Sequence, residues 1–140
     1  MTILGIDYGR VHVGLAVGHE EPRLALPRKT ISGVSRASLL EMLATLAKEE
    51  AVDKVVVGLP RAQRPEQETG EGFRADVEAF CAVLEERVGL PVVQVDERFT
   101  SRAAAILRRD YPPADEHALA AMLIVDTYLD KRLYEQDNQH

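Results

Sequence analysis

Hydrophobic positions at the start of the chain predict three β-strands. Residues 2–8, TILGIDY, place apolar side chains around a glycine without alternation, as expected for a strand buried on both faces. After a turn at 9–10, residues 11–17 alternate valine and leucine with small or polar residues. The two segments should form a β-hairpin. A third strand is expected over 23–31, where Pro22 just before it and Pro27 within it make it an edge strand or an irregular one.

Apolar residues farther along the chain recur at helical spacing. A first helix is expected from the N-cap residue Ser35 to about residue 50, and a second over 72–88. A third should start after Thr100 or Ser101 and break at prolines 112 and 113, and a terminal helix should run from Asp115 to about residue 135. Each of these segments has one apolar face and should pack on the sheet.

Two short apolar runs between these helices predict the remaining strands. They are DKVVVGLP from Asp53 and LPVVQV over 90–95, which leads directly to Asp96 and Glu97. The polar segment from Arg61 to Gly72 has no periodicity and is expected to be a mobile loop. The order of elements predicts an α/β fold with a mixed sheet of about five strands and helices on both faces.

Length and composition fit one globular domain. The chain has 140 residues, of which 46% are hydrophobic and 29% charged. We expect a single domain over 1–136 and a disordered tail over 137–140. No apolar run reaches the roughly 18 residues needed to cross a bilayer, and residues 1–10 show no export signal, which predicts a cytoplasmic protein without membrane contact. Cys81 is the single cysteine, so no internal disulfide can form.

The net charge of −6 argues against broad electrostatic affinity for nucleic acid. It does not exclude a nuclease, because an acidic protein can carry a local basic patch, and carboxylates at a metal site are neutralised by the metal.

The candidate functional acids lie at the ends of predicted strands. Asp7 closes the first strand and Glu97 follows the last, where ligands of parallel sheets gather. Asp7 could instead cap the turn at Gly9, and Glu97 could be a solvated turn acid.

The sequence resembles a known family through four blocks, in this order: ILGIDYG with VGLAVG, KVVVGLP, VDERFTS, and ALAAMLIVDTYLD. They are similar to those of the YqgF/RuvX family, candidate pre-16S ribosomal RNA nucleases that are similar to Holliday-junction resolvases. The resemblance covers 3–130 and implies a ribonuclease H-like fold. It also implies hydrolysis of phosphodiester bonds with two divalent cations, Mg²⁺ or Mn²⁺, held between acids. Asp7 and Glu97 would be metal ligands.

The third implied ligand is where the chain departs from the family. An acid usually stands shortly before the Ala-Ala pair of the terminal helix, and this chain has His117 there. Neutral imidazole is a competent metal ligand and would favour Mn²⁺, although His117 could also have a packing or capping role. Asp115 suits the N-cap and Glu116 the first turn, and either could still reach a metal. Asp126 lies nine residues beyond His117, two and a half helical turns away, and should lie on the solvated face.

Substrate contacts would come from local basic and hydroxyl groups. The candidates are Arg10, Arg61, Arg64, Arg98, Thr100 and Arg102. Arg98 could instead hold Glu97 in place, and each arginine could be solvated surface. Arg10 and His12 also differ from the residues usual in the family.

The implied substrate is RNA, namely pre-16S ribosomal RNA, with branched DNA as the alternative. A DNA-junction resolvase would require a homodimer with two sites. A catalytically weakened nucleic-acid-binding module stays open because of the missing third acid. An actin-like or sugar-kinase fold shares the strand-Asp-x-Gly motif but needs two lobes, and this length supplies one.

Overall fold

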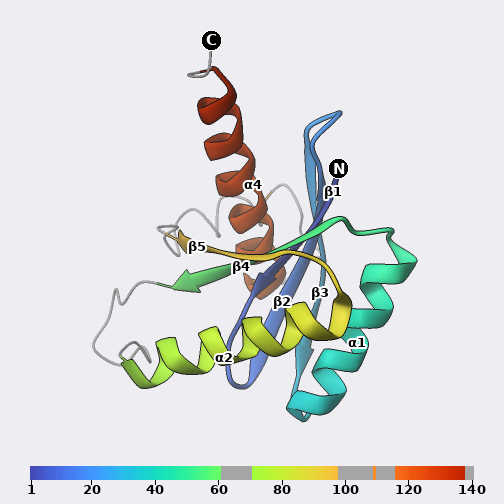
Figure 1. The fold of residues 1–140 in the computed structure, drawn as a ribbon, viewed down its shortest axis with the longest axis vertical. Helices are drawn as coiled ribbons and strands as arrows, with labels where there is room; N and C mark the ends of the chain where they lie inside the picture. The colour runs from blue at the N-terminus through green and yellow to red at the C-terminus, as the bar shows by residue number, and fades with distance from the viewer. Residues whose placement is uncertain (61–70, 98–108, 110–115, 138–140) are drawn as a thin grey trace.

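The computed structural model describes residues 1–60, 71–97, 109 and 116–137. Within these ranges the chain forms five strands and three helices (Figure 1). The strands are β1 (Thr2–Asp7), β2 (His12–His19), β3 (Leu24–Ser32), β4 (Lys54–Pro60) and β5 (Val92–Glu97). The helices are α1 (Arg36–Glu49), α2 (Glu71–Val88) and α4 (Glu116–Asp137). None of these helices is long and apolar enough to cross a membrane.

The strands form one mixed sheet in the order β3-β2-β1-β4-β5. The β1-β2-β3 meander is antiparallel, whereas β1, β4 and β5 run parallel. The predicted mixed five-stranded sheet is therefore confirmed, and β3, which contains Pro27, is an edge strand. The carboxyl ends of the three parallel strands lie at one end of the sheet, as the sequence reasoning required.

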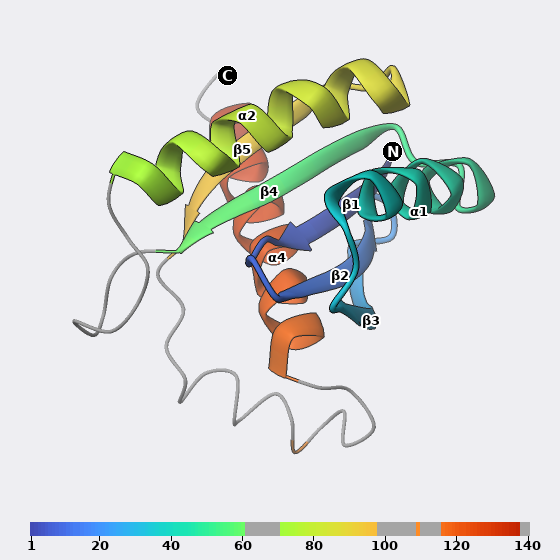
Figure 2. The ribbon, with the colours of Figure 1, turned by 90° about the horizontal axis from the view of Figure 1, so that it is seen from below.

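Helices cover both faces of this sheet (Figure 2). On one face, α1 and α2 bury a cluster that includes Leu4, Leu15 and Phe80. On the other face, α4 buries a second cluster that includes Ile3 and Val56. Alternate residues of β1 thus belong to different clusters, because successive side chains of a strand point to opposite faces. This alternation explains why the first strand carries apolar residues without a break.

The boundaries of the helices follow local chemistry. Ser35 caps α1, and its hydroxyl accepts a hydrogen bond from the backbone N–H of Ser38 at 3.1 Å, as predicted. Helix α2 begins at Glu71, one residue before its predicted start, and so includes the last two residues of the predicted loop. Helix α4 extends to Asp137, so the predicted tail loses its first residue to the helix. The rest of that tail, the rest of that loop and the predicted helix after Ser101 lie outside the described residues.

Glu97 differs slightly from its expected place. It was expected just past the last strand, but β5 includes it as its final residue, paired in register with Pro60 of β4. The strand therefore fixes the backbone of Glu97.

Truncation of a buried side chain in the core between the sheet and helices α1 and α2 should destabilise the protein. Phe80 is fully buried, and its ring stacks on that of Tyr8 with centroids 4.3 Å apart. We expect Phe80→Ala to lower the free energy of unfolding by about 3 to 5 kcal/mol, because it leaves a cavity and removes this contact. Urea denaturation measures the change.

The control is Val83→Ala on the same helix, where the side chain is 42% exposed. The loss in the free energy of unfolding should stay near 0.5 kcal/mol, roughly the scale of surface substitutions. Equal losses in the two variants would contradict this description of the core.

Candidate functional site

Asp7 ends β1 on the face that α4 covers. Ile3 packs under α4, and position 7 is an even number of residues away, so strand alternation sends its side chain to the same face. The Asp7 side chain is only 17% exposed. A carboxylate that is this buried is costly unless hydrogen bonds or a cation compensate it. The Asp7 carboxylate therefore needs a hydrogen-bond donor or a cation beside it.

The partner comes from the first turn of α4. Nδ1 of His117 lies 3.8 Å from Oδ2 of Asp7, and the His117 side chain is 42% exposed. Gly14 makes this approach possible, because it pairs with Asp7 in the β1-β2 register and a Cβ there would overlap the carbonyl oxygen of His117. The backbone of α4 thus rests directly on β2. That contact brings the histidine of the last helix to the acid of the first strand.

The Asp7–His117 pair fits a divalent cation. A separation of 3.8 Å is too long for a hydrogen bond. Two ligand atoms that each lie about 2.1 Å from one metal ion are at most about 4.2 Å apart, so one ion can coordinate both Oδ2 of Asp7 and Nδ1 of His117. Among the described residues, no group of three His, Cys, Asp or Glu side chains is arranged to hold a metal. The side chain of Glu97, the expected further ligand, lies outside what the structure describes.

The backbone of Glu97 is nevertheless well placed. Asp7 pairs with Gly58 of β4, and Gly58 pairs with Val95 of β5, two residues before Glu97. The backbone of Glu97 thus lies two strands across the sheet from Asp7, about 10 Å away in the hydrogen-bonding direction, and two residues farther along its strand.

Arg10 contacts α2. Its guanidinium donates to Oδ2 of Asp76 at 2.9 Å and lies 5.8 Å from the centre of the Phe73 ring. Phe73 packs in the cluster on the face opposite α4. The other predicted nucleic-acid contacts, Arg61, Arg64, Arg98, Thr100 and Arg102, lie outside the described residues, as does Asp115.

The acids Glu116 and Asp126 of α4 have other surroundings. Glu116 is exposed in the first turn. Asp126 forms an ion pair of 3.7 Å with Arg23, which also binds Asp130 at 2.7 Å. Burial raises the pKa of Asp126, opposed by the nearby Arg23. The Asp126 side chain is 43% exposed and lies beside the turn between β2 and β3, on a partly solvated face of α4.

His12 is a residue of this site that the sequence marked only as different from the residue usual in the family. Its ring stacks on that of His117, with centroids 4.9 Å apart. His12 belongs to the alternating set of β2 that includes Gly14 and Ala16, and Ala16 packs under α4. This alternation is the signal that could have placed His12 on the face of Asp7.

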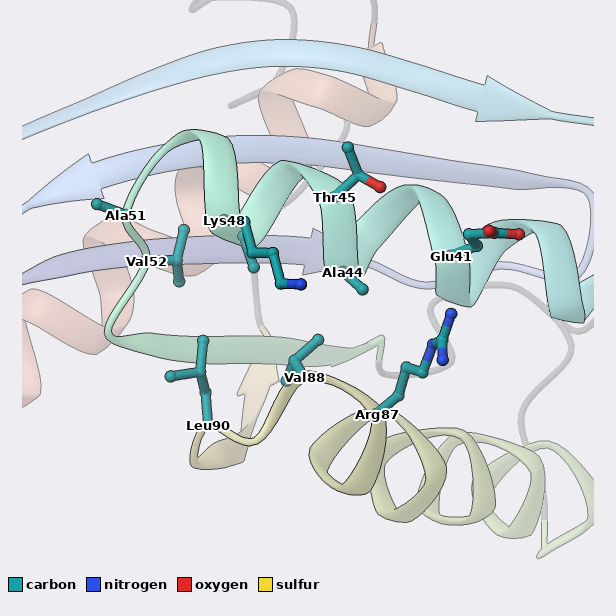
Figure 3. A pocket seen from close by; sticks show the side chains of 10 residues that line it. Glu41, Ala44, Thr45, Lys48, Ala51, Val52, Arg87, Val88 and Leu90 are labelled. Atoms are coloured by element: carbon teal, nitrogen blue, oxygen red, sulfur yellow. The ribbon is translucent and has the colours of Figure 1, made fainter.

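Two other features carry no chemistry of this kind. Cys81 is buried, and burial together with Glu78 and Glu85 raises its pKa to about 11, so it stays a thiol at neutral pH. A groove of about 540 Å³ lies between α1 and α2, where Arg87 reaches toward Glu41 (Figure 3). It lies on the sheet face opposite Asp7.

The chain is similar to known proteins over nearly its whole length. The sequence model of the RuvX family, described as Holliday junction resolvase, matches residues 1–131. A relative from Chloroflexus aurantiacus is 33% identical, over 99% of this chain and 92% of that protein. A relative from Chloroflexus aggregans is 36% identical over 94% of each chain. Both are named as candidate pre-16S rRNA nucleases.

Solved structures show the same fold. The RuvC structure of Thermus thermophilus matches with a TM-score of 0.70 at 16% identity, over 95% of this chain and 96% of that one. The fowlpox virus resolvase in complex with Holliday junction DNA matches with a TM-score of 0.61 at 9% identity, over 95% of this chain and 99% of that one. The fold is ribonuclease H-like, as the sequence resemblance implied.

Proposed function

Because this chain belongs to the RuvX family, a family of nucleases, we propose that it is a metal-dependent hydrolase of RNA phosphodiester bonds. Its proposed role is the 5′-end maturation of pre-16S ribosomal RNA in the cytoplasm, which agrees with the names of its relatives. The observation that carries the proposal is the pairing of a largely buried Asp7 carboxylate with the His117 imidazole at the end of a parallel strand.

Three residues would hold the ions. Asp7 and His117 supply an oxygen and a nitrogen donor 3.8 Å apart. Glu97, the final residue of β5, would supply further oxygens. Two bound Mg²⁺ or Mn²⁺ ions would provide an activated water and stabilise the leaving oxyanion. The imidazole favours Mn²⁺ over Mg²⁺, because softer ions accept nitrogen ligands more readily.

The fold contributes the placing of these donors. The carboxylate of Asp7 is fixed by a strand that is bonded on both sides, to β2 and to β4. His117 is fixed by a helix whose backbone rests on Gly14. Donors on rigid elements need little rearrangement when an ion or a phosphate binds, which is the main protein contribution to phosphodiester hydrolysis.

Contacts to the RNA backbone are assigned to Arg61, Arg64, Arg98, Thr100 and Arg102, which follow β4 and β5 in the sequence. All of them follow strands whose carboxyl ends lie at the same end of the sheet as Asp7. Arg10 stays a candidate for a phosphate contact, and it would have to share its guanidinium with Asp76.

Cleavage of branched DNA is the second candidate function. It is favoured by the description of the family that matches, and it would require a homodimer with two sites. The solved resolvases are similar in fold alone, at 16% identity or less, and therefore do not decide between the substrates.

A cleavage assay distinguishes these functions. The full chain is incubated with precursor 16S RNA, unstructured RNA and a four-way DNA junction, each with Mg²⁺ or Mn²⁺. We expect cleavage of the precursor RNA, faster with Mn²⁺, and none after chelation with EDTA. Cleavage of the junction alone would replace RNA by branched DNA as the substrate. Binding of RNA without cleavage under any condition would identify a binding module and overturn the proposed nuclease.

A further inference from the structure

A second imidazole lies beside the Asp7–His117 pair. His12 opens β2, and its ring stacks on the ring of His117 with centroids 4.9 Å apart and an angle of 27° between the planes. This distance lies in the range of attractive ring contacts, about 4.5 to 7 Å between centroids. His12 itself is exposed, so burial in a core does not explain its position.

The His12 ring is anchored to the sheet. Its Nδ1 lies 2.7 Å from the hydroxyl oxygen of Ser32, which is its direct neighbour across β2 and β3. The hydrogen bond joins two adjacent strands and leaves one face of the His12 ring against His117. His12 is thus held by the sheet, whereas His117 belongs to the helix that packs on the sheet.

The stack with His12 restricts the orientation of the His117 ring. The His117 side chain is 42% exposed and sits in the first turn of α4. A partly exposed side chain can rotate about both of its torsions, and most rotamers would carry Nδ1 away from Asp7. Metal-binding histidines are generally oriented by a hydrogen bond from their other ring nitrogen, and loss of that orientation weakens the metal site. In this chain the stacked His12 ring supplies an orienting contact.

We infer that His12 is a positioning residue whose ring, fixed through Ser32, holds the His117 imidazole beside Asp7 for metal binding. The inference rests on the proposed function of His117. His12 is not itself assigned as a ligand, because Asp7, His12 and His117 are all described and no metal-holding group of three is found among the described residues. The stack thus orients the His117 imidazole, and His12 itself does not bind the metal.

Metal affinity tests this role. Isothermal titration of the full chain with Mn²⁺ should show that His12→Ala weakens binding about tenfold, the order expected for a residue that orients a ligand. His12→Phe keeps an aromatic face against His117 but loses the hydrogen bond to Ser32, so it should restore part of the affinity. The matched control is His19→Ala at the other end of β2, where Nδ1 also lies near a hydroxyl, that of Thr2 at 3.2 Å. This control should bind Mn²⁺ like the wild type.

Ring resonances separate this inference from the proposed function. In the metal-free protein, long-range ¹H–¹⁵N spectra should show that the His117 ring signals lose their ring-current shift in His12→Ala and keep it in His12→Phe. Unmoved His117 signals, or Mn²⁺ affinity that is unchanged in His12→Ala, would overturn the inference. Equal loss of affinity in the alanine and phenylalanine variants would also overturn it. The proposed function is judged separately, by wild-type cleavage of RNA and by the effect of His117→Ala on Mn²⁺ affinity.

Discussion

Replacing Asp7 by asparagine is expected to lower the rate of RNA cleavage by a factor of about 1,000 or more. The substitution keeps the size of the side chain but removes the charge that would hold a divalent cation. Metal ions contribute several kcal/mol of transition-state stabilisation, and about 4 kcal/mol corresponds to three powers of ten in rate. The fold should survive, because an amide is less costly than a carboxylate at a position that is 17% exposed.

Single-turnover cleavage with saturating Mn²⁺ measures this effect. The matched control is Asp126→Asn, which makes the same chemical change on α4, where the carboxylate pairs with Arg23 instead of His117. The control should cleave RNA at the wild-type rate. Thermal unfolding of both variants checks that any loss is one of chemistry. Cleavage by Asp7→Asn within tenfold of the wild type would refute the metal site at Asp7.

The sheet could be read from the sequence because its signals are local. The unbroken apolar pattern of the first strand and the β-branched run after Asp53 each report burial on both faces, and both segments became central strands. The cap at Ser35 was likewise predictable, since capping depends on residues within one turn. The end of β5 was misplaced by one or two residues, because pairing with β4 continues through an acidic residue that has no strand preference of its own.

The site was less predictable because it depends on contacts between distant segments. Alternation along β1 places Asp7 on one face, but only the path of α4 across the sheet decides which residue of that helix meets it. The same holds for His12, whose stack joins positions that are far apart in the chain. The ion pair of Arg10 with Asp76 depends on how α2 lies against the β1-β2 turn, which no local pattern contains.

Substitution of Gly14 by alanine should affect both stability and activity, and it should do so through one contact. A Cβ at this position would overlap the carbonyl oxygen of His117, which is backbone and cannot rotate away. The start of α4 must then move off β2, at a cost of about 3 kcal/mol in the free energy of unfolding, in the upper range for overpacking. The same movement separates His117 from Asp7. A displacement of about 1 Å in a positioned group can cost about 100-fold in rate.

The control for this prediction is Gly72→Ala in α2, where an added Cβ meets nothing within 4 Å. Alanine favours a helix over glycine, so this variant should be as stable as the wild type or more stable by up to about 1 kcal/mol. Urea denaturation and RNA cleavage at a temperature where both variants are folded measure the two effects. If Gly14→Ala kept its stability but lost cleavage, the glycine would serve the site without supporting the helix. If it kept both, α4 could not rest on β2 as described, and the Asp7–His117 pair would lose its structural basis.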